Sequence, residues 1–284
     1  MPEVVPPVGH GSRLRDALSQ RSIVPFIGIY DAFSASLAGR RYDAIFLSGF
    51  GFAASRYGLP DAGFVTWSDV LAFTQRLRSL LPTHHLLVDV DDGYGDAEVA
   101  GHVVSLLEAA GASGIVLEDQ RRPRRCGHLD GKQLLDLDDY LEKLRRVLAA
   151  RRDLFVVART DAGDADEIRR RVEAFDAAGA DAILVDGVCD PSLIGDLSRR
   201  ASRSFAFNQI AGGRSPALTL TELRRMGVSL VIYSTPCLFA AQRAIEESLD
   251  GMQARDGRLE PAGGGAVGVA ECTAVLDRNL FRRR

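Results

Sequence analysis

The sequence predicts an α/β protein, a single (β/α)8 barrel of the TIM type. Three observations predict it: eight short apolar runs alternate with longer amphipathic segments, no linker divides the chain, and 284 residues suit a barrel, which needs about 250. The runs are apolar on both faces, as parallel strands covered on both sides are. They are residues 23–29, 44–47, 85–88, 114–117, 154–158, 182–185, 204–207 and 228–233. A doubly wound open sheet is the alternative, but the turn after the first run lacks the glycines usual there.

Three amphipathic segments predict helices and their first residues. Residues 12–20 begin with Ser12, whose hydroxyl suits a helix N-cap. Residues 138–150 carry leucines at helical spacing, with Asp138 as their cap. In residues 164–178 the apolar side chains share one face, and the arginines lie on the others.

The barrel divides the chain into three parts. Residues 1–11 are a flexible lead-in, residues 12–250 form the catalytic barrel, and residues 251–284 form a helical tail that contains the run Gly263–Gly265. Two interpretations of the tail stay open: it packs on a neighbouring subunit, or it is a loosely attached terminus.

Charge and composition exclude several kinds of partner. Lys+Arg 35 against Asp+Glu 38 gives a formal net charge of −3, without the basic face that nucleic acid requires. No apolar stretch reaches the roughly 20 residues of a membrane helix, and the first residues lack the pattern of a signal peptide. The four cysteines lie far apart, so a disulfide framework or a structural zinc site is not expected. We predict a cytoplasmic protein that binds neither nucleic acid nor a membrane.

Polar side chains follow every one of the apolar runs. In a barrel the carboxyl ends of the strands and the loops after them form the active site, so these residues should meet at one mouth. They are Tyr30 and Asp31, Ser48 and Gly49, Asp89 and Asp91, Glu118 and Asp119, Arg159, Asp186, Asn208, and Tyr233 and Ser234.

Two acidic residues after the third run predict a metal site. Asp89 and Asp91 point the same way if the segment is extended, because side chains alternate along a strand. Converging carboxylates repel unless a cation or a proton relieves them. With Glu118 from the next run they form an oxygen-only cluster suited to Mg²⁺ or Mn²⁺. The alternative is a helix-capping Asp and an ordinary polar turn.

The segment from Glu118 to Lys132 carries a thiol in a basic loop. Cys126 is flanked by arginines and is followed by His128, a setting that lowers a thiol pKa and eases proton transfer. Glycines and charges make the loop a candidate lid. The alternative is a solvated basic loop with an incidental cysteine, and the local sequence does not separate the two.

Arg159 follows a buried-looking strand and predicts an anion site. A planar carboxylate or phosphate suits the fork of a guanidinium. The alternative is an internal ion pair of Arg159 with Glu118 or Asp161.

An ordered series of motifs then resembles one superfamily. The motifs are Tyr30-Asp31-Ala32-Phe33-Ser34-Ala35, Ser48-Gly49-Phe50-Gly51, Gly58-Leu59-Pro60-Asp61, Asp89-Val90-Asp91-Asp92-Gly93-Tyr94-Gly95, Glu118-Asp119-Gln120, Arg125-Cys126-Gly127-His128, Ala158-Arg159-Thr160-Asp161, and Asn208 with Gly212-Gly213-Arg214. From about Ile29 to Ala241 the chain resembles the isocitrate lyase/phosphoenolpyruvate mutase superfamily. The Cys-Gly-His loop resembles its 2-methylisocitrate lyase, dimethylmalate lyase and carboxyphosphonoenolpyruvate mutase branch.

The resemblance implies a Mg²⁺-dependent barrel that acts on small 2-oxo or 2-hydroxy carboxylates, as a tetramer with exchanged C-terminal helices. The implied metal ligands are Asp89 and Asp91, with Asp61 and Glu118 as further ligands, mostly through water. The implied substrate-binding residues are Ser48, Gly49, Phe50, Gly127, Arg159, Asp186 and Asn208. The implied catalytic residues are Cys126 as proton donor, Arg159, His128 and, as a partner for the substrate hydroxyl, Tyr30.

Four positions depart from the superfamily pattern. Arg124 stands in place of a lysine, and an arginine cannot give up its proton at working pH. Ala211 and Asp186 each replace a glutamate. Phe239 stands where methylisocitrate lyases carry a carboxylate-binding arginine, which argues against a tricarboxylate substrate.

Three functions follow as hypotheses. The first is a lyase that cleaves or forms a C–C bond of a small 2-hydroxy or 2-oxo acid, in which Mg²⁺ and Arg159 stabilise an enolate and Cys126 supplies a proton. The second is phosphoryl transfer between carbon and oxygen, or P–C hydrolysis, at the same metal site. The third is a barrel that binds a small acid without turning it over.

Overall fold

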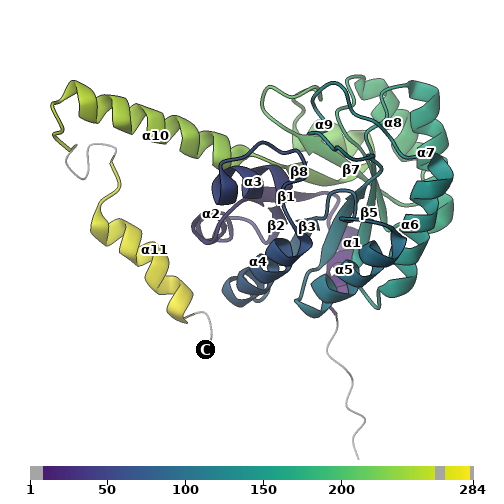
Figure 1. Cartoon of the computed structure of the whole chain (residues 1–284), viewed down its shortest axis with the longest axis horizontal. Coiled ribbons are helices and arrows are strands. Elements are labelled where there is room, and N and C mark those ends of the chain that lie inside the picture. Colours follow the sequence, from purple (N-terminus) through teal and green to yellow (C-terminus); the bar gives the residue numbers. More distant parts are fainter. Residues whose placement is uncertain (1–8, 260–265, 282–284) are drawn as a thin grey trace, which may run out of the picture.

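A computed structural model describes residues 9–259 and 266–281 of the chain (Figure 1). Eight parallel strands close into a barrel in sequence order, and β8 pairs with β1, which confirms the predicted (β/α)8 fold. The strands are β1 (Val24–Ile29), β2 (Ala44–Leu47), β3 (His85–Asp89), β4 (Gly114–Glu118), β5 (Phe155–Thr160), β6 (Ala182–Val185), β7 (Ser204–Gln209) and β8 (Val228–Tyr233). Each predicted run contains one of these strands or overlaps it.

Helices surround the barrel, except for the last two of the described chain, which lie to one side of it, and α1 covers the end at which the strands begin (Figure 1). They are α1 (His10–Gln20), α2 (Ala32–Ala38), α3 (Gly49–Tyr57), α4 (Trp67–Leu80), α5 (Ala97–Ala109), α6 (Leu137–Ala150), α7 (Ala165–Ala178), α8 (Pro191–Arg200), α9 (Leu220–Arg225), α10 (Pro236–Ala254) and α11 (Val269–Phe281). In the described residues no helix is both long enough and apolar enough to cross a membrane.

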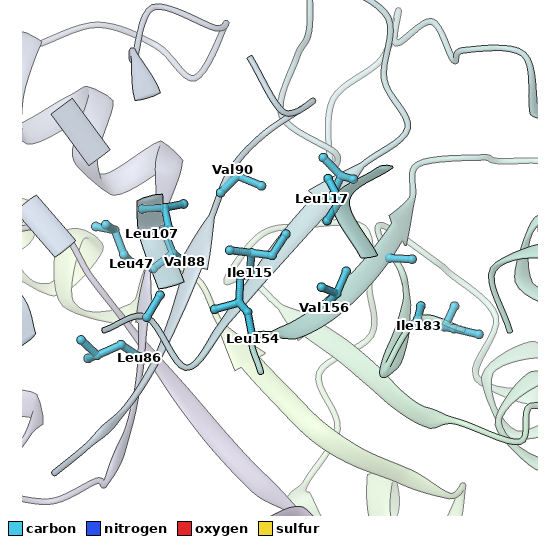
Figure 2. Close-up of a cluster of buried hydrophobic side chains, with 14 of the residues drawn as sticks. Leu47, Leu86, Val88, Val90, Leu107, Ile115, Leu117, Leu154, Val156 and Ile183 are labelled. Atoms are coloured by element: carbon cyan, nitrogen blue, oxygen red, sulfur yellow. The ribbon is translucent and has the colours of Figure 1, made fainter. Parts of the chain in front are cut away.

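The strands separate two apolar layers. Alternate residues such as Phe26 and Phe46 point into the barrel, where Leu14 of α1 joins them. The residues between them, such as Ile45 and Leu47, point outward and pack against the helices. Figure 2 shows part of this outer layer, with side chains of β2 to β6 and with Leu107 of α5 next to Leu47 and Val88. This alternation fixes the register of the strands, because a shift of one residue would exchange the two layers.

The first helix begins earlier than predicted and is capped from another part of the chain. It begins at His10, with Gly9 rather than Ser12 as its N-cap residue. Asp153, in the loop before β5, accepts hydrogen bonds from the backbone N–H groups of Gly11 (2.8 Å) and Ser12 (3.0 Å). A carboxylate there also complements the positive end of the helix dipole. The predicted lead-in therefore ends before His10, and residues 1–8 lie outside the described residues.

Two predictions about the later helices are also wrong in detail. The N-cap of α6 is Asp136, so Asp138 lies in its first turn. In α7 one arginine is buried: Arg171 is only 3% exposed and pairs with Asp119 at 2.9 Å. It lies three residues after Ile168, on the same side of the helix as the apolar stripe.

The tail leaves the barrel as two helices. None of the described residues of α10 is buried, and the helix projects away from the barrel (Figure 1). The boundary predicted at residue 250 falls inside this helix. The helical part of the predicted tail is α11, which contacts α2 of its own chain: Asn279 donates to Ser36 (2.9 Å), and Val275 accepts from Arg40 (3.0 Å). Gly263–Gly265 lie outside the described residues.

Candidate active site

Strand ends bring most of the predicted site residues to one mouth of the barrel. Asp89 ends β3, Glu118 ends β4 and Arg159 lies near the end of β5. Asp186 follows β6, and Asn208 lies in β7. All five are less than a tenth exposed, so the charges among them meet in a region with little solvent.

Asp89 and Asp91 converge, although not for the predicted reason. The chain is not extended at Asp91, which has a φ of +49°. The left-handed turn nevertheless brings both carboxylates to the start of α3, where a Cβ on Gly49 would lie 3.0 Å from Asp89 Oδ2 and 3.1 Å from Asp91 Oδ1. The backbone N–H of Gly49 donates to Asp89 at 3.3 Å. Glycine at this position therefore leaves room for the two carboxylates.

Arg124 lies among the carboxylates that were predicted to hold a metal. Its guanidinium pairs with Glu118 (Nε to Oε1, 2.7 Å), with Asp91 (3.4 Å) and with Asp61, which lies in the loop after α3. The side chain is 1% exposed. The picture of a solvated basic loop is therefore wrong for Arg124, and its place among these three acids was not predicted.

Burial is the main cause of the raised pKa values of the carboxyl groups in this cluster. It raises the pKa of Asp91 to about 7 and that of Glu118 to about 8, even though the Arg124 guanidinium acts in the opposite direction on both. Burial also raises the pKa of Asp89. In these three groups burial therefore outweighs the stabilisation that the nearby arginines give to the ionised forms. More positive charge would therefore stabilise their ionised forms.

Arg159 is engaged in ion pairs within the chain. It pairs with Asp186 at 2.6 Å, with Asp161 at 3.0 Å and with Glu118 at 3.4 Å. The internal ion pairs posed as the alternative are thus present. Burial opposes the charge on Asp186, yet the Arg159 guanidinium keeps the pKa of that carboxyl well below its usual range. A substrate anion at Arg159 would have to share it with these carboxylates.

The loop that carries Cys126 lies directly on Arg159. A Cβ on Gly127 would come within 2.4 Å of Arg159 Nη2 and of Asp161 Oδ1, and within 2.2 Å of Asp186 Oδ2, so only glycine fits there. Cys126 itself is 9% exposed, and burial raises the pKa of its thiol to about 11. The predicted lowering of this pKa is wrong, because desolvation outweighs the arginines nearby. The thiol is therefore protonated at neutral pH.

Side chains of two motifs anchor this loop, and the sequence interpretation gave them no role. The amide of Gln120 donates to the backbone carbonyl of Arg125 (2.7 Å) and accepts from its backbone N–H (2.8 Å). Lys132 donates to the carbonyl of Gly127. A polar residue two positions after a strand end, as Gln120 is, was a signal that could have indicated such an anchor.

His128 joins the loop to the far side of the mouth. Its Nδ1 accepts from the backbone N–H of Arg214 (2.9 Å), and its Nε2 lies 3.2 Å from Asp186 Oδ1. The Nδ1 contact places the ring proton on Nε2, facing Asp186. Asn208 donates to the same Asp186 oxygen (2.9 Å) and accepts from Ser234 (2.7 Å). The predicted residues His128, Asp186 and Asn208 thus form one hydrogen-bonded group.

The first turn of α3 supplies the remaining predicted binding residues. Ser48 is the N-cap of α3 and accepts from the backbone N–H of Gly51 (3.2 Å). Phe50 contacts Phe239 of α10 edge to face, with 6.1 Å between ring centroids. This part of the site combines a helix N-terminus, which favours anions, with an apolar pair.

Tyr30 lies in a different environment. It lines a cavity of about 430 Å³ together with Asp31, Phe52, Ser55 and Phe73, between α2, α3 and α4. None of the cluster carboxylates lines this cavity. Tyr30 nevertheless lies against the first turn of α3, since a Cβ on Gly51 would come within 2.9 Å of the Tyr30 Cβ.

The donor chemistry of the cluster fits a hard divalent cation, because Asp61, Asp89, Asp91 and Glu118 offer only carboxylate oxygens. As the side chains stand around Arg124 they are not a coordination centre. Across residues 9–259 and 266–281 no group of three or more His, Cys, Asp or Glu side chains is arranged to hold a metal ion. The residue types therefore fit a divalent cation, but the guanidinium of Arg124 lies among their carboxylates.

A closed barrel with acids, arginines and a buried thiol at its strand ends defines the class, a TIM-barrel enzyme. The family model described as "Phosphoenolpyruvate phosphomutase" matches residues 14–253. A 2-methylisocitrate lyase from Aeropyrum pernix is 33% identical over 243 residues, which are 84% of this chain and 78% of the relative.

Solved structures agree. A crystal structure of 2,3-dimethylmalate lyase, described as a PEP mutase/isocitrate lyase superfamily member, has a TM-score of 0.89 at 28% identity and covers 97% of this chain and 95% of its own. Phosphonopyruvate hydrolase in complex with oxalate and Mg²⁺ has a TM-score of 0.83 at 28% identity, with 97% and 98% covered. The chain belongs to the phosphoenolpyruvate phosphomutase family and so to this superfamily of enzymes, as its motifs predicted.

Proposed function

We propose that this protein is a divalent-metal-dependent lyase that cleaves or forms a C–C bond in a small 2-hydroxy or 2-oxo carboxylic acid. The relatives support the reaction class, since two of them are named as lyases of such acids. The burial of the Cys126 thiol at the mouth, next to a glycine that lets its loop lie directly on Arg159, is the observation that carries the proposal.

The chain's own residues take the following parts. When bound by Asp61, Asp89, Asp91 and Glu118, Mg²⁺ or Mn²⁺ would supply positive charge to offset the negative charge that develops on the substrate. Arg159 and the N–H groups at the start of α3, near Ser48, Gly49 and Phe50, would bind the carboxylate. His128 and Asn208 would hold Asp186, and Asp186 would orient Arg159.

Cleavage requires two proton transfers, one from the substrate hydroxyl and one to the departing fragment. The substrate hydroxyl loses its proton to a basic group at the mouth and becomes a carbonyl, while the C–C bonding pair moves to the departing fragment. The Cys126 S–H group then donates its proton to the carbanion carbon of that fragment. A thiol that is protonated at working pH is suited to this step and unsuited to nucleophilic attack.

The apolar side of the mouth suggests the substrate class. Phe50 and Phe239 pack edge to face where the resemblance led us to expect an arginine. An apolar contact favours a substrate with an alkyl group over one with a third carboxylate, because these two rings offer that carboxylate no charged or hydrogen-bonding partner. We propose a mono- or dicarboxylate that carries small alkyl substituents.

A metal-supplemented screen of 2-hydroxy and 2-oxo acids, read out by the release of pyruvate, glyoxylate or oxalate, tests the activity. In Cys126→Ser we expect turnover to fall by about 10² to 10⁴, the usual contribution of a positioned acid, because a serine hydroxyl is a much weaker acid. Cys189→Ser, at an exposed cysteine beyond β6, should keep wild-type turnover. Full activity in Cys126→Ser, or release of none of these products from any acid, would contradict the proposal.

P–C bond chemistry at the same residues is the second candidate. The similarity to phosphonopyruvate hydrolase favours it. Phosphorus NMR of phosphonopyruvate or phosphoenolpyruvate incubated with the protein separates the two, because the lyase leaves both spectra unchanged.

We also propose that the projecting tail contacts a second copy of the chain in a homo-oligomer. Ile245 and Leu249 of α10 are more than half exposed, as is Leu280 of α11. Light scattering after size exclusion tests this. Ile245→Glu combined with Leu249→Glu should reduce the mass, and an unchanged mass would argue against the contact.

A further inference from the structure

We infer that Arg124 is a built-in cation that neutralises the acidic cluster when no divalent metal is bound, and that a metal must displace it to enter. The inference rests on the proposed function, since it concerns the same carboxylates. It goes beyond that function by assigning this loop residue a competing role toward the metal.

The contacts of Arg124 are those a cation in the metal's place would make. It pairs with Asp61, Asp91 and Glu118, which are three of the four proposed ligands and come from three different segments. Glu118 receives two of its N–H groups, at 2.7 Å and 3.3 Å. Because the Arg124 side chain is only 1% exposed, water contributes little to the solvation of its charge. A buried guanidinium is stable only where carboxylates replace that water.

The two cations compete for the same carboxylates. A divalent ion needs carboxylate oxygens to face one centre, and those of Asp61, Asp91 and Glu118 face the guanidinium instead. A lysine in this position could lose its proton beside a metal ion and stay in place. An arginine keeps its charge at any working pH, so Arg124 has to move away.

Metal affinity, measured without turnover, tests the inference. The full-length protein is freed of metal with a chelator and titrated with Mn²⁺, and free Mn²⁺ is followed by electron paramagnetic resonance. Arg124→Gln should bind Mn²⁺ at least about tenfold more tightly than wild type, because the competing charge is gone. Arg121→Gln removes the same charge from an exposed position of the loop and should leave the affinity unchanged. Arg124→Lys should lie between wild type and Arg124→Gln.

Thermal unfolding supplies the second readout, also if Arg124→Gln folds poorly. Without metal, Arg124→Gln should melt below wild type, and saturating Mn²⁺ should raise its Tm more than it raises that of wild type. Equal or weaker Mn²⁺ binding by Arg124→Gln, or an equal gain in Arg121→Gln, overturns the inference and leaves the proposed function intact. Absence of Mn²⁺ binding in every variant overturns the inference and the proposed metal site together.

Discussion

The two ends of the barrel treat charge in opposite ways. At the end covered by α1, Arg15 pairs with Asp153 and Asp181, and Arg151 pairs with Asp181, so acids and bases are equal in number and partly exposed. At the mouth, three cationic side chains, Arg124, Lys132 and Arg159, form the ion pairs of five carboxyl groups, and nearly all of these side chains are buried. The five are Asp61, Asp91, Glu118, Asp161 and Asp186, and Asp89 lies beside Asp91. The balanced ion pairs at the covered end join α1 to the loops before β5 and β6. The mouth instead holds carboxyl groups whose ionised forms are disfavoured by burial, and a bound cation would stabilise those forms and the folded protein with them.

Removing an apolar side chain from the covered end should have the largest effect on stability. Leu14 of α1 is fully buried among the residues that fill the barrel. Leu14→Ala should lower the free energy of unfolding by about 2–5 kcal/mol, because it removes apolar contacts and leaves a cavity. Denaturant unfolding measures this, and Leu18→Ala, at a half-buried position of the same helix, should cost clearly less. Since the mouth lies at the other end, kcat of the folded Leu14→Ala protein should stay within about twofold of wild type. A large fall in kcat would show that the two ends are not separate.

A methyl group at the mouth should do the reverse and reduce activity more than stability. In Gly127→Ala the new Cβ would overlap Arg159, Asp161 and Asp186, so the loop with Cys126 must move by about an ångström. Misplacement of that size lowers turnover by about 10²-fold. Initial rates measure this, with Gly163→Ala as the control, since a Cβ at Gly163 meets nothing within 4 Å. Unimpaired turnover in Gly127→Ala would mean that the loop does not act from this position.

The sequence predicted the barrel and the strand-end residues because both follow from local patterns. Apolar runs mark the strands, and a polar residue directly after a buried run has to lie at the mouth. The position of Arg124 could not be predicted in this way, since its burial depends on Asp61, 63 residues earlier in the chain. The thiol pKa was predicted in the wrong direction for a similar reason, because charge is visible in the neighbouring residues and burial is not. The burial of Arg171 was predictable from its spacing to Ile168 and Phe175.

A smaller effect is expected from His85 at the covered end, on the pH dependence of the free energy of unfolding. His85 begins β3 at the covered end and is 8% exposed, and burial lowers its pKa from 6.5 to about 4. Because the folded state disfavours the charged ring, the stability that neutral His85 contributes is complete above pH 6.5 and is lost as the pH falls toward 4. Between pH 7.5 and pH 5 this contribution should fall by about 2 kcal/mol. The raised pKa values of Asp91 and Glu118 act in the opposite direction, so the contribution is measured as the difference between wild type and His85→Gln in denaturant unfolding at both pH values. That difference should change by about 2 kcal/mol between the two pH values, whereas the difference between wild type and His102→Gln, at an exposed position of α5, should stay constant. A constant difference for His85→Gln as well would show that the histidine at the covered end does not set the acid sensitivity.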